Sequence, residues 1–73
     1  MPSLPVLSGK AVCSILASHG FENVRQSGGH VIMQLKLQGT TITDLMPNHK
    51  ELRTGTLRSI IRQSGLSIEE FTK

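Results

Sequence analysis

Apolar residues recur at helical spacing near both ends of the chain, and between these segments they alternate with polar residues. In the first segment, one stripe at intervals of three or four is formed by Val12, Ile15, Leu16 and His19. Ser8 precedes the stripe as a candidate N-cap, and Gly20 follows it as a left-handed stop. The pattern predicts a helix over residues 9–19.

The middle of the chain has the two-residue period of β-strands. Residues 23–27 form a short polar segment, residues 30–37 alternate with Ile32 as the apolar exception on the polar side, and residues 40–46 are rich in β-branched side chains. The dipeptides Gly28-Gly29 and Gln38-Gly39 separate these segments. Two-residue connections of this composition predict two tight antiparallel hairpins, and therefore a sheet of three consecutive strands.

A second helical segment follows a polar loop over residues 47–53. It begins at Thr54 or Gly55 and stops at Gly65, and its apolar stripe is formed by Leu57, Ile60 and Ile61. The pair Ser67 and Glu70 has the spacing of a capping box, which predicts a short last helix ending near Phe71.

The element order is therefore α-β-β-β-α with a short terminal helix. This order predicts an α+β fold in which helices cover one face of a three-stranded antiparallel sheet. At this length, we expect residues 1–73 to form a single domain.

The turn lengths fix the strand register by counting. The helix-facing side of the second hairpin then carries the pairs Leu37 and Thr40, Leu35 and Ile42, Met33 and Asp44, and Val31 and Met46. Asp44 is the charged exception on that side, which Val24 and Gln26 are expected to join. The open side carries Arg25, Ser27, His30, Gln34, Lys36, Thr41 and Thr43.

The same register places the loop over residues 47–50 beside the start of the second strand. This loop also leads into the N-terminus of the second long helix, and helix N-termini bind anions. We therefore expect four side chains to converge at this end of the sheet: Arg25, His30, His49 and Lys50.

Composition narrows the function classes. The formal charge of +3 on 73 residues favours an anionic partner, either nucleic acid or an acidic protein. Trp and Tyr are absent, which argues against binding single strands on aromatic platforms. The chain contains no apolar run long enough for a transmembrane helix, no signal-peptide pattern, and a single cysteine, Cys13, so a reducing cytoplasm is expected.

Metal and thiol chemistry are not favoured by the residue spacing. The histidines at 19, 30 and 49 lack the spacing of zinc sites, and Asp44 and Glu51 have no third acidic neighbour. We expect His19 to cap or pack its helix, and Cys13 to be a small helix residue. No metal or cofactor is expected.

Three sequence pieces, in this order and spacing, resemble the HicA family of bacterial messenger-RNA interferase toxins. They are RQSGGH at 25–30, PNHKEL at 47–52 and GTLRSIIRQSGL at 55–66, and the resemblance extends from Ser8 to Phe71. It implies a fold like the double-stranded-RNA-binding domain, endoribonuclease activity without a metal, and a cognate antitoxin of the HicB type. The family's catalytic histidine lies in a Gly-Ser-His motif, which corresponds to His30 here; the motif serine is replaced by Gly29.

The sequence thus predicts a monomeric cytoplasmic toxin that cleaves messenger RNA, with His30 as its proton-transfer residue. The residues expected to bind RNA are Arg25, Lys36, His49 and Lys50. Two alternatives remain open. Gly29 is compatible with a non-catalytic RNA-binding module of the same fold, and the basic face is also suited to an acidic protein partner.

Overall fold

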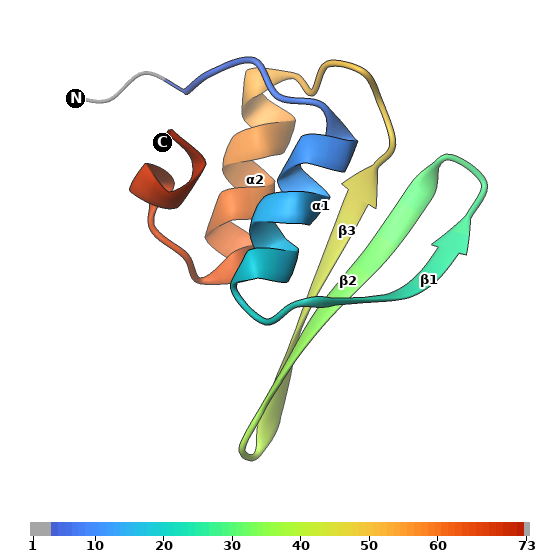
Figure 1. The fold of residues 1–73 in the computed structure, drawn as a ribbon, viewed down its shortest axis with the longest axis vertical. Helices are drawn as coiled ribbons and strands as arrows, with labels where there is room; N and C mark the ends of the chain where they lie inside the picture. Colours follow the sequence, from blue (N-terminus) through green and yellow to red (C-terminus); the bar gives the residue numbers. More distant parts are fainter. Residues whose placement is uncertain (1–3, 73) are drawn as a thin grey trace.

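The computed structural model describes residues 4–72 and shows two helices packed on a three-stranded sheet (Figure 1). In chain order, the elements are α1 (Gly9–Ser18), β1 (Glu22–Ser27), β2 (His30–Leu37), β3 (Thr40–Pro47), α2 (Thr54–Ser64) and the 3-10 helix η1 (Ile68–Phe71). The α-β-β-β-α order and the α+β class are confirmed. None of the helices within residues 4–72 has the length and apolar character needed to cross a lipid bilayer.

The sheet is antiparallel with the order β1-β2-β3, so β2 is central and β3 is an edge strand. The register of β2 and β3 is the one that the turn lengths predict, from the pair His30 and Pro47 to the pair Leu37 and Thr40. The turn of this hairpin extends beyond the helices at the lower end of Figure 1. The two helices lie against the other part of the sheet.

The register of β1 and β2 is as predicted near their turn, where Ser27 pairs with His30 and Arg25 with Ile32. The strands then shift by one residue between Asn23 and Arg25. Such a bulge sets one additional residue against the partner strand. The prediction that Val24 packs on the helix-facing side is wrong, because Val24 lies at the bulge and is 44% exposed.

The core lies between the helices and the sheet and draws on every element except β1. Its buried apolar members are Val12, Leu16, Phe21, Val31, Met33, Met46, Leu52, Leu57, Ile60, Ile61 and Phe71. The predicted stripes of both long helices are therefore largely confirmed. The Ser8 hydroxyl accepts a hydrogen bond from the Ala11 N–H at 3.0 Å, as expected for an N-cap.

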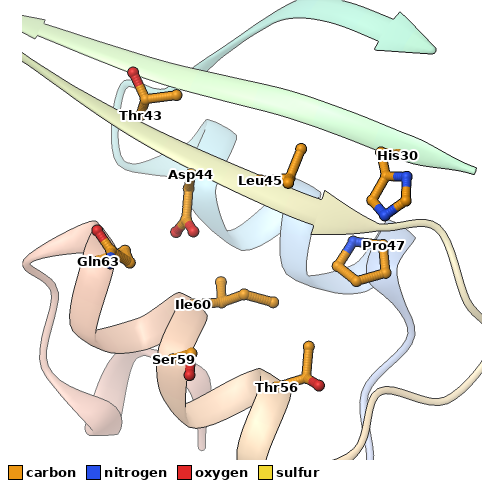
Figure 2. Close-up of a pocket in the computed structure, with 9 residues that line it drawn as sticks. All are labelled: His30, Thr43, Asp44, Leu45, Pro47, Thr56, Ser59, Ile60 and Gln63. Atoms are coloured by element: carbon orange, nitrogen blue, oxygen red, sulfur yellow. The ribbon is translucent and has the colours of Figure 1, made fainter.

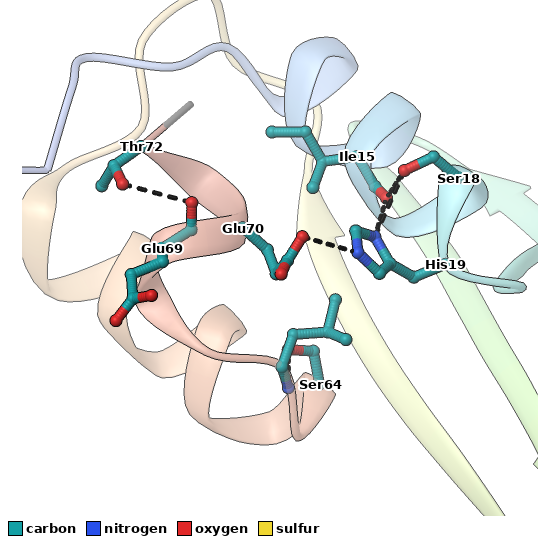
Figure 3. A network of polar contacts seen from close by, with 8 residues as sticks. Ile15, Ser18, His19, Ser64, Glu69, Glu70 and Thr72 are labelled. Carbon is teal, nitrogen blue, oxygen red and sulfur yellow. Dashed lines mark hydrogen bonds and ion pairs between the residues drawn. The ribbon is translucent and has the colours of Figure 1, made fainter.

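The C-terminal η1 is fastened to α1 through His19 (Figure 3). One ring nitrogen of His19 lies 2.9 Å from the Ile15 carbonyl oxygen, and the other lies 2.9 Å from a Glu70 carboxylate oxygen. The prediction that His19 has a packing role is confirmed. The predicted capping box is wrong: Ser67 makes no side-chain cap bond, and the Glu70 carboxylate turns toward α1 because a single 3-10 turn leaves it facing His19.

Candidate functional site

The candidate site is built around the turn between β1 and β2. Gly28 has a φ of 58°, a left-handed conformation that glycine adopts without steric cost. This turn places His30 at the first position of β2, where it pairs with Ser27 on one side and Pro47 on the other. The His30 side chain is exposed, as the sequence predicts.

A loop from β3 to α2 passes beside this turn and is held by three backbone hydrogen bonds. The Asn48 N–H donates to the Gly29 carbonyl oxygen at 2.6 Å, and the His49 carbonyl accepts from the Gly9 N–H at 2.8 Å. Further along, the Leu52 N–H donates to the Leu7 carbonyl at 2.8 Å. These bonds fix the loop between the turn and the start of α1, so His30 and His49 belong to the same end of the sheet.

The predicted cationic residues divide into two groups. Arg25 pairs with Ile32 close to the turn, and Lys50 lies in the loop that follows β3; both are exposed. Lys36, by contrast, lies six positions along β2 from His30, which corresponds to about 20 Å of extended strand. The structure therefore brings Arg25 and Lys50 to the end that carries His30, and leaves Lys36 near the opposite end.

A groove of about 390 Å³ runs between the edge strand β3 and α2, with His30 at one end (Figure 2). The His30 ring lies beside Pro47 in this view. From α2, the groove is lined by Thr56, Ser59, Ile60 and Gln63. The sequence predicted Ile60 as part of the apolar stripe of this helix, but it did not point to Thr56, Ser59 or Gln63 as site residues. Their spacing places them on one side of α2, but short polar side chains at such positions also occur on helix faces that contact only water.

Asp44 lies at the bottom of this groove and points from β3 toward α2 (Figure 2). Only 2% of its surface is exposed, and among residues 4–72 its Oδ2 atom has no hydrogen-bond partner. Burial disfavours the charged carboxylate and raises the pKa of Asp44 to about 7. The charged exception that the register identified is therefore a genuine buried carboxyl group.

A comparison with protein-family models matches residues 9–66 to the HicA toxin of bacterial toxin–antitoxin systems. The match runs from the start of α1 to just beyond α2, and it includes the turn, His30, the loop and the groove.

The chain therefore belongs to the HicA toxin family, and its class is that of a toxin with an antitoxin partner. A comparison with curated proteins gave no match.

Proposed function

We propose that this toxin is a metal-independent endoribonuclease that cleaves messenger RNA in the cytoplasm, with His30 as its proton-transfer residue. The observation that supports this most directly is the position of His30, exposed beside a glycine turn and next to a loop that carries His49 and Lys50. The sugar–phosphate backbone of an RNA can approach such a turn closely, because neither Gly28 nor Gly29 has a side chain.

Cleavage of RNA requires one group to remove a proton from the attacking oxygen and one to donate a proton to the leaving oxygen. Histidine serves either role near neutral pH. We assign the principal role to His30 and an assisting role to His49. The cations Arg25 and Lys50 stabilise the charge that develops on the phosphate, while Lys36 contributes a more distant phosphate contact.

The metal-independent mechanism is supported by the distribution of ligands. Within residues 4–72, no group of three or more His, Cys, Asp and Glu side chains is placed to hold a metal ion. Two-metal nucleases gather several such ligands around the scissile phosphate. At the His30 end of this sheet, the chemistry is instead carried by imidazoles and cations.

We further propose that residues 1–73 act as one domain, since a single core joins elements from α1 to η1. The antitoxin is proposed to be of the HicB type, with acidic surface that complements the net charge of +3.

The test is cleavage of a long messenger RNA by the purified chain in the presence of a chelator. We expect His30→Ala to slow cleavage by about 10²–10⁴-fold, the usual contribution of a general acid or base, and His49→Ala to slow it less. Gln38→Ala, a change in the distant β2–β3 turn, serves as the matched control. Unchanged cleavage by His30→Ala contradicts the assignment.

Binding measured on the same RNA separates the enzyme from the alternative of an RNA-binding module. Because phosphate contacts dominate the affinity of such proteins for RNA, binding should weaken steeply as salt increases. Salt-dependent binding by the unaltered chain without any cleavage would favour the non-catalytic module.

A further inference from the structure

The groove between β3 and α2 has the composition of a ligand site. Its volume of about 390 Å³ falls in the range of about 300–1,000 Å³ that is usual for pockets that bind small molecules. Pro47 and Ile60 contribute apolar surface, while Thr56, Ser59 and Gln63 contribute neutral groups that both donate and accept hydrogen bonds. A flat, uncharged ring with hydrogen-bonding groups at its edge fits this mixed apolar and polar lining better than an aliphatic group does.

The carboxyl group of Asp44 supplies the second and independent observation. It is 98% buried, lies on the otherwise apolar face of the sheet and points toward α2, and its buried Oδ2 atom has no partner among residues 4–72. Buried polar atoms are almost always hydrogen-bonded, because leaving one unpaired costs free energy. An unpaired acceptor just beneath the lining of a groove therefore identifies a place where a donor from a ligand would be stabilised.

We propose that this groove binds a nucleobase of the RNA through its exocyclic amino group, with Asp44 as the hydrogen-bond acceptor. The inference rests on the proposed function, because the base is that of a nucleotide whose phosphate lies at His30, at the end of the same groove. Because the Oδ2 atom of Asp44 is buried, the proposal requires the exposed Gln63 side chain, which also lines the groove, to turn aside and admit the base edge.

The proposal has a definite chemical selectivity. Adenine, cytosine and guanine carry an exocyclic amino group, whereas uracil presents a carbonyl oxygen at the corresponding position, which an ionised carboxylate repels. Because the pKa of Asp44 is about 7, this selectivity applies above that pH, where the carboxylate can only accept hydrogen bonds. The chain has no Trp or Tyr to stack against a base. Recognition here therefore depends on the hydrogen-bonding edge of the base rather than on its face.

A lysine or arginine side chain of the antitoxin is the other donor that could occupy the groove. It is less favoured, because α2 already carries the exposed Arg58 and Arg62 and the chain has a net charge of +3. The neutral lining of Thr56, Ser59 and Gln63 also offers no additional negative charge to a cation. This alternative is included as an outcome of the test.

The experiment is an NMR titration of the full chain at about pH 8, above the pKa of Asp44, with 3′-mononucleotides that differ at the exocyclic amino position. Cytidine is compared with uridine, and guanosine with inosine. We expect the amino-bearing member of each pair to bind at least about fivefold more tightly, and to shift the amide signals of Thr43, Ser59 and Gln63. Equal affinity within both pairs, or shifts confined to residues outside the groove, would overturn the proposal.

Two variants assign the selectivity to Asp44. Asp44→Leu removes the acceptor and should abolish the difference within each pair, whereas Asp44→Asn keeps one acceptor oxygen and should retain part of it. Glu69→Gln, which removes the same charge at an exposed position outside the groove, should behave as the unaltered chain. If neither Asp44 variant folds, the titration of the unaltered chain still tests whether the groove prefers the amino-bearing nucleotide of each pair.

Two further outcomes separate this inference from its alternatives. Tighter binding of N-acetylarginine amide than of any nucleotide at these signals would assign the groove to a protein partner and overturn the proposal. The titration does not depend on catalysis, so unselective binding together with normal, His30-dependent cleavage would refute the base site and leave the proposed nuclease intact.

Discussion

The backbone N–H of Asn48 donates a hydrogen bond to the carbonyl oxygen of Gly29 at 2.6 Å. His30 directly follows one of these residues and His49 directly follows the other. A single main-chain bond therefore holds the two histidine-bearing segments at one end of the sheet. The bond from the Gly9 N–H to the His49 carbonyl adds the start of α1 to this assembly.

Gly9→Ala should disrupt this assembly. A Cβ atom at position 9 would overlap the Pro47 carbonyl oxygen and would approach the Asn48 Cα to 3.2 Å. Because both neighbours are backbone, they cannot rotate away. We expect the free energy of unfolding to fall by about 1–3 kcal/mol, the usual cost of overpacking, and urea denaturation measures it.

The matched control for this change is Gly55→Ala. Gly55 is also a glycine in the first turn of a helix, but a Cβ there would meet nothing within 4 Å. We expect a neutral result or a gain of up to about 1 kcal/mol, since alanine favours helix over glycine. Equal losses in the two variants would contradict the proposed contact with Pro47.

Gly29→Ser introduces the serine that the resemblance to the family implies at this turn, and the structure has room for it. A Cβ at Gly29 meets nothing within 4 Å, and Gly29 is not among the glycines with positive φ. For Gly29→Ser, we expect an unchanged free energy of unfolding and equal or faster RNA cleavage. The control measured beside it is Gly28→Ser, which should be less stable because Gly28 has a φ of 58°. Loss of cleavage by Gly29→Ser would show that a hydroxyl at this turn is harmful.

Asp44 should make stability depend on pH. Its pKa is about 7 in the folded chain and near 3.8 when unfolded, so the folded state holds a proton that the unfolded state loses between these values. Its stabilising contribution is therefore complete below about pH 4, declines as the pH rises toward 7, and is absent above it. Across this pH range, the free energy of unfolding should change by up to about 4 kcal/mol, since each unit of difference between the folded and unfolded pKa corresponds to 1.36 kcal/mol.

Urea denaturation from pH 4.5 to pH 8 measures this effect as the difference between the unaltered chain and Asp44→Asn. The asparagine variant does not titrate, so it should become the more stable of the two as the pH rises. Glu69→Gln removes an exposed carboxylate and should keep the pH slope of the unaltered chain. A constant difference between Asp44→Asn and the unaltered chain would refute the buried titration.

Glu70→Ala should loosen the attachment of η1 to α1. It removes the 2.9 Å contact with His19, in which both side chains are a little over a quarter exposed. We expect the free energy of unfolding to fall by about 0.5–1.5 kcal/mol, the usual net value of one hydrogen bond. Glu69→Ala, beside it in the same turn but exposed, should have a smaller effect in the same thermal unfolding assay.

Local pattern and turn length were sufficient to predict most of the fold. The β2–β3 register follows by counting from the two-residue turn at Gln38-Gly39, and the alternation over residues 30–37, in which Ile32 is the exception, disfavours a slip of one position. The bulge at Val24 could not be predicted in this way. Residues 22–27 are almost entirely polar, so their pattern specifies no buried face and does not reveal an inserted residue.

The arrangement of the candidate site was predicted only where it depends on strand register. Counting along the strands places the loop that contains His49 beside His30, and the structure has this arrangement. The groove depends on how α2 packs against the edge of β3, which local sequence does not determine. The sequence identified Asp44 as a charged residue on an otherwise apolar face. Its burial beside the groove could not be predicted, because it depends on the position of α2.

The β2–β3 turn extends beyond the helices, and Leu37 beside it is 48% exposed. Gln38 lies roughly 25 Å along the strand from His30. A fluorescent dye attached through a cysteine at position 38, with Cys13 replaced, would thus be remote from the end of the sheet that carries His30. Because position 38 is two residues from Lys36, the dye would report whether RNA extends along β2 as far as the proposed Lys36 contact.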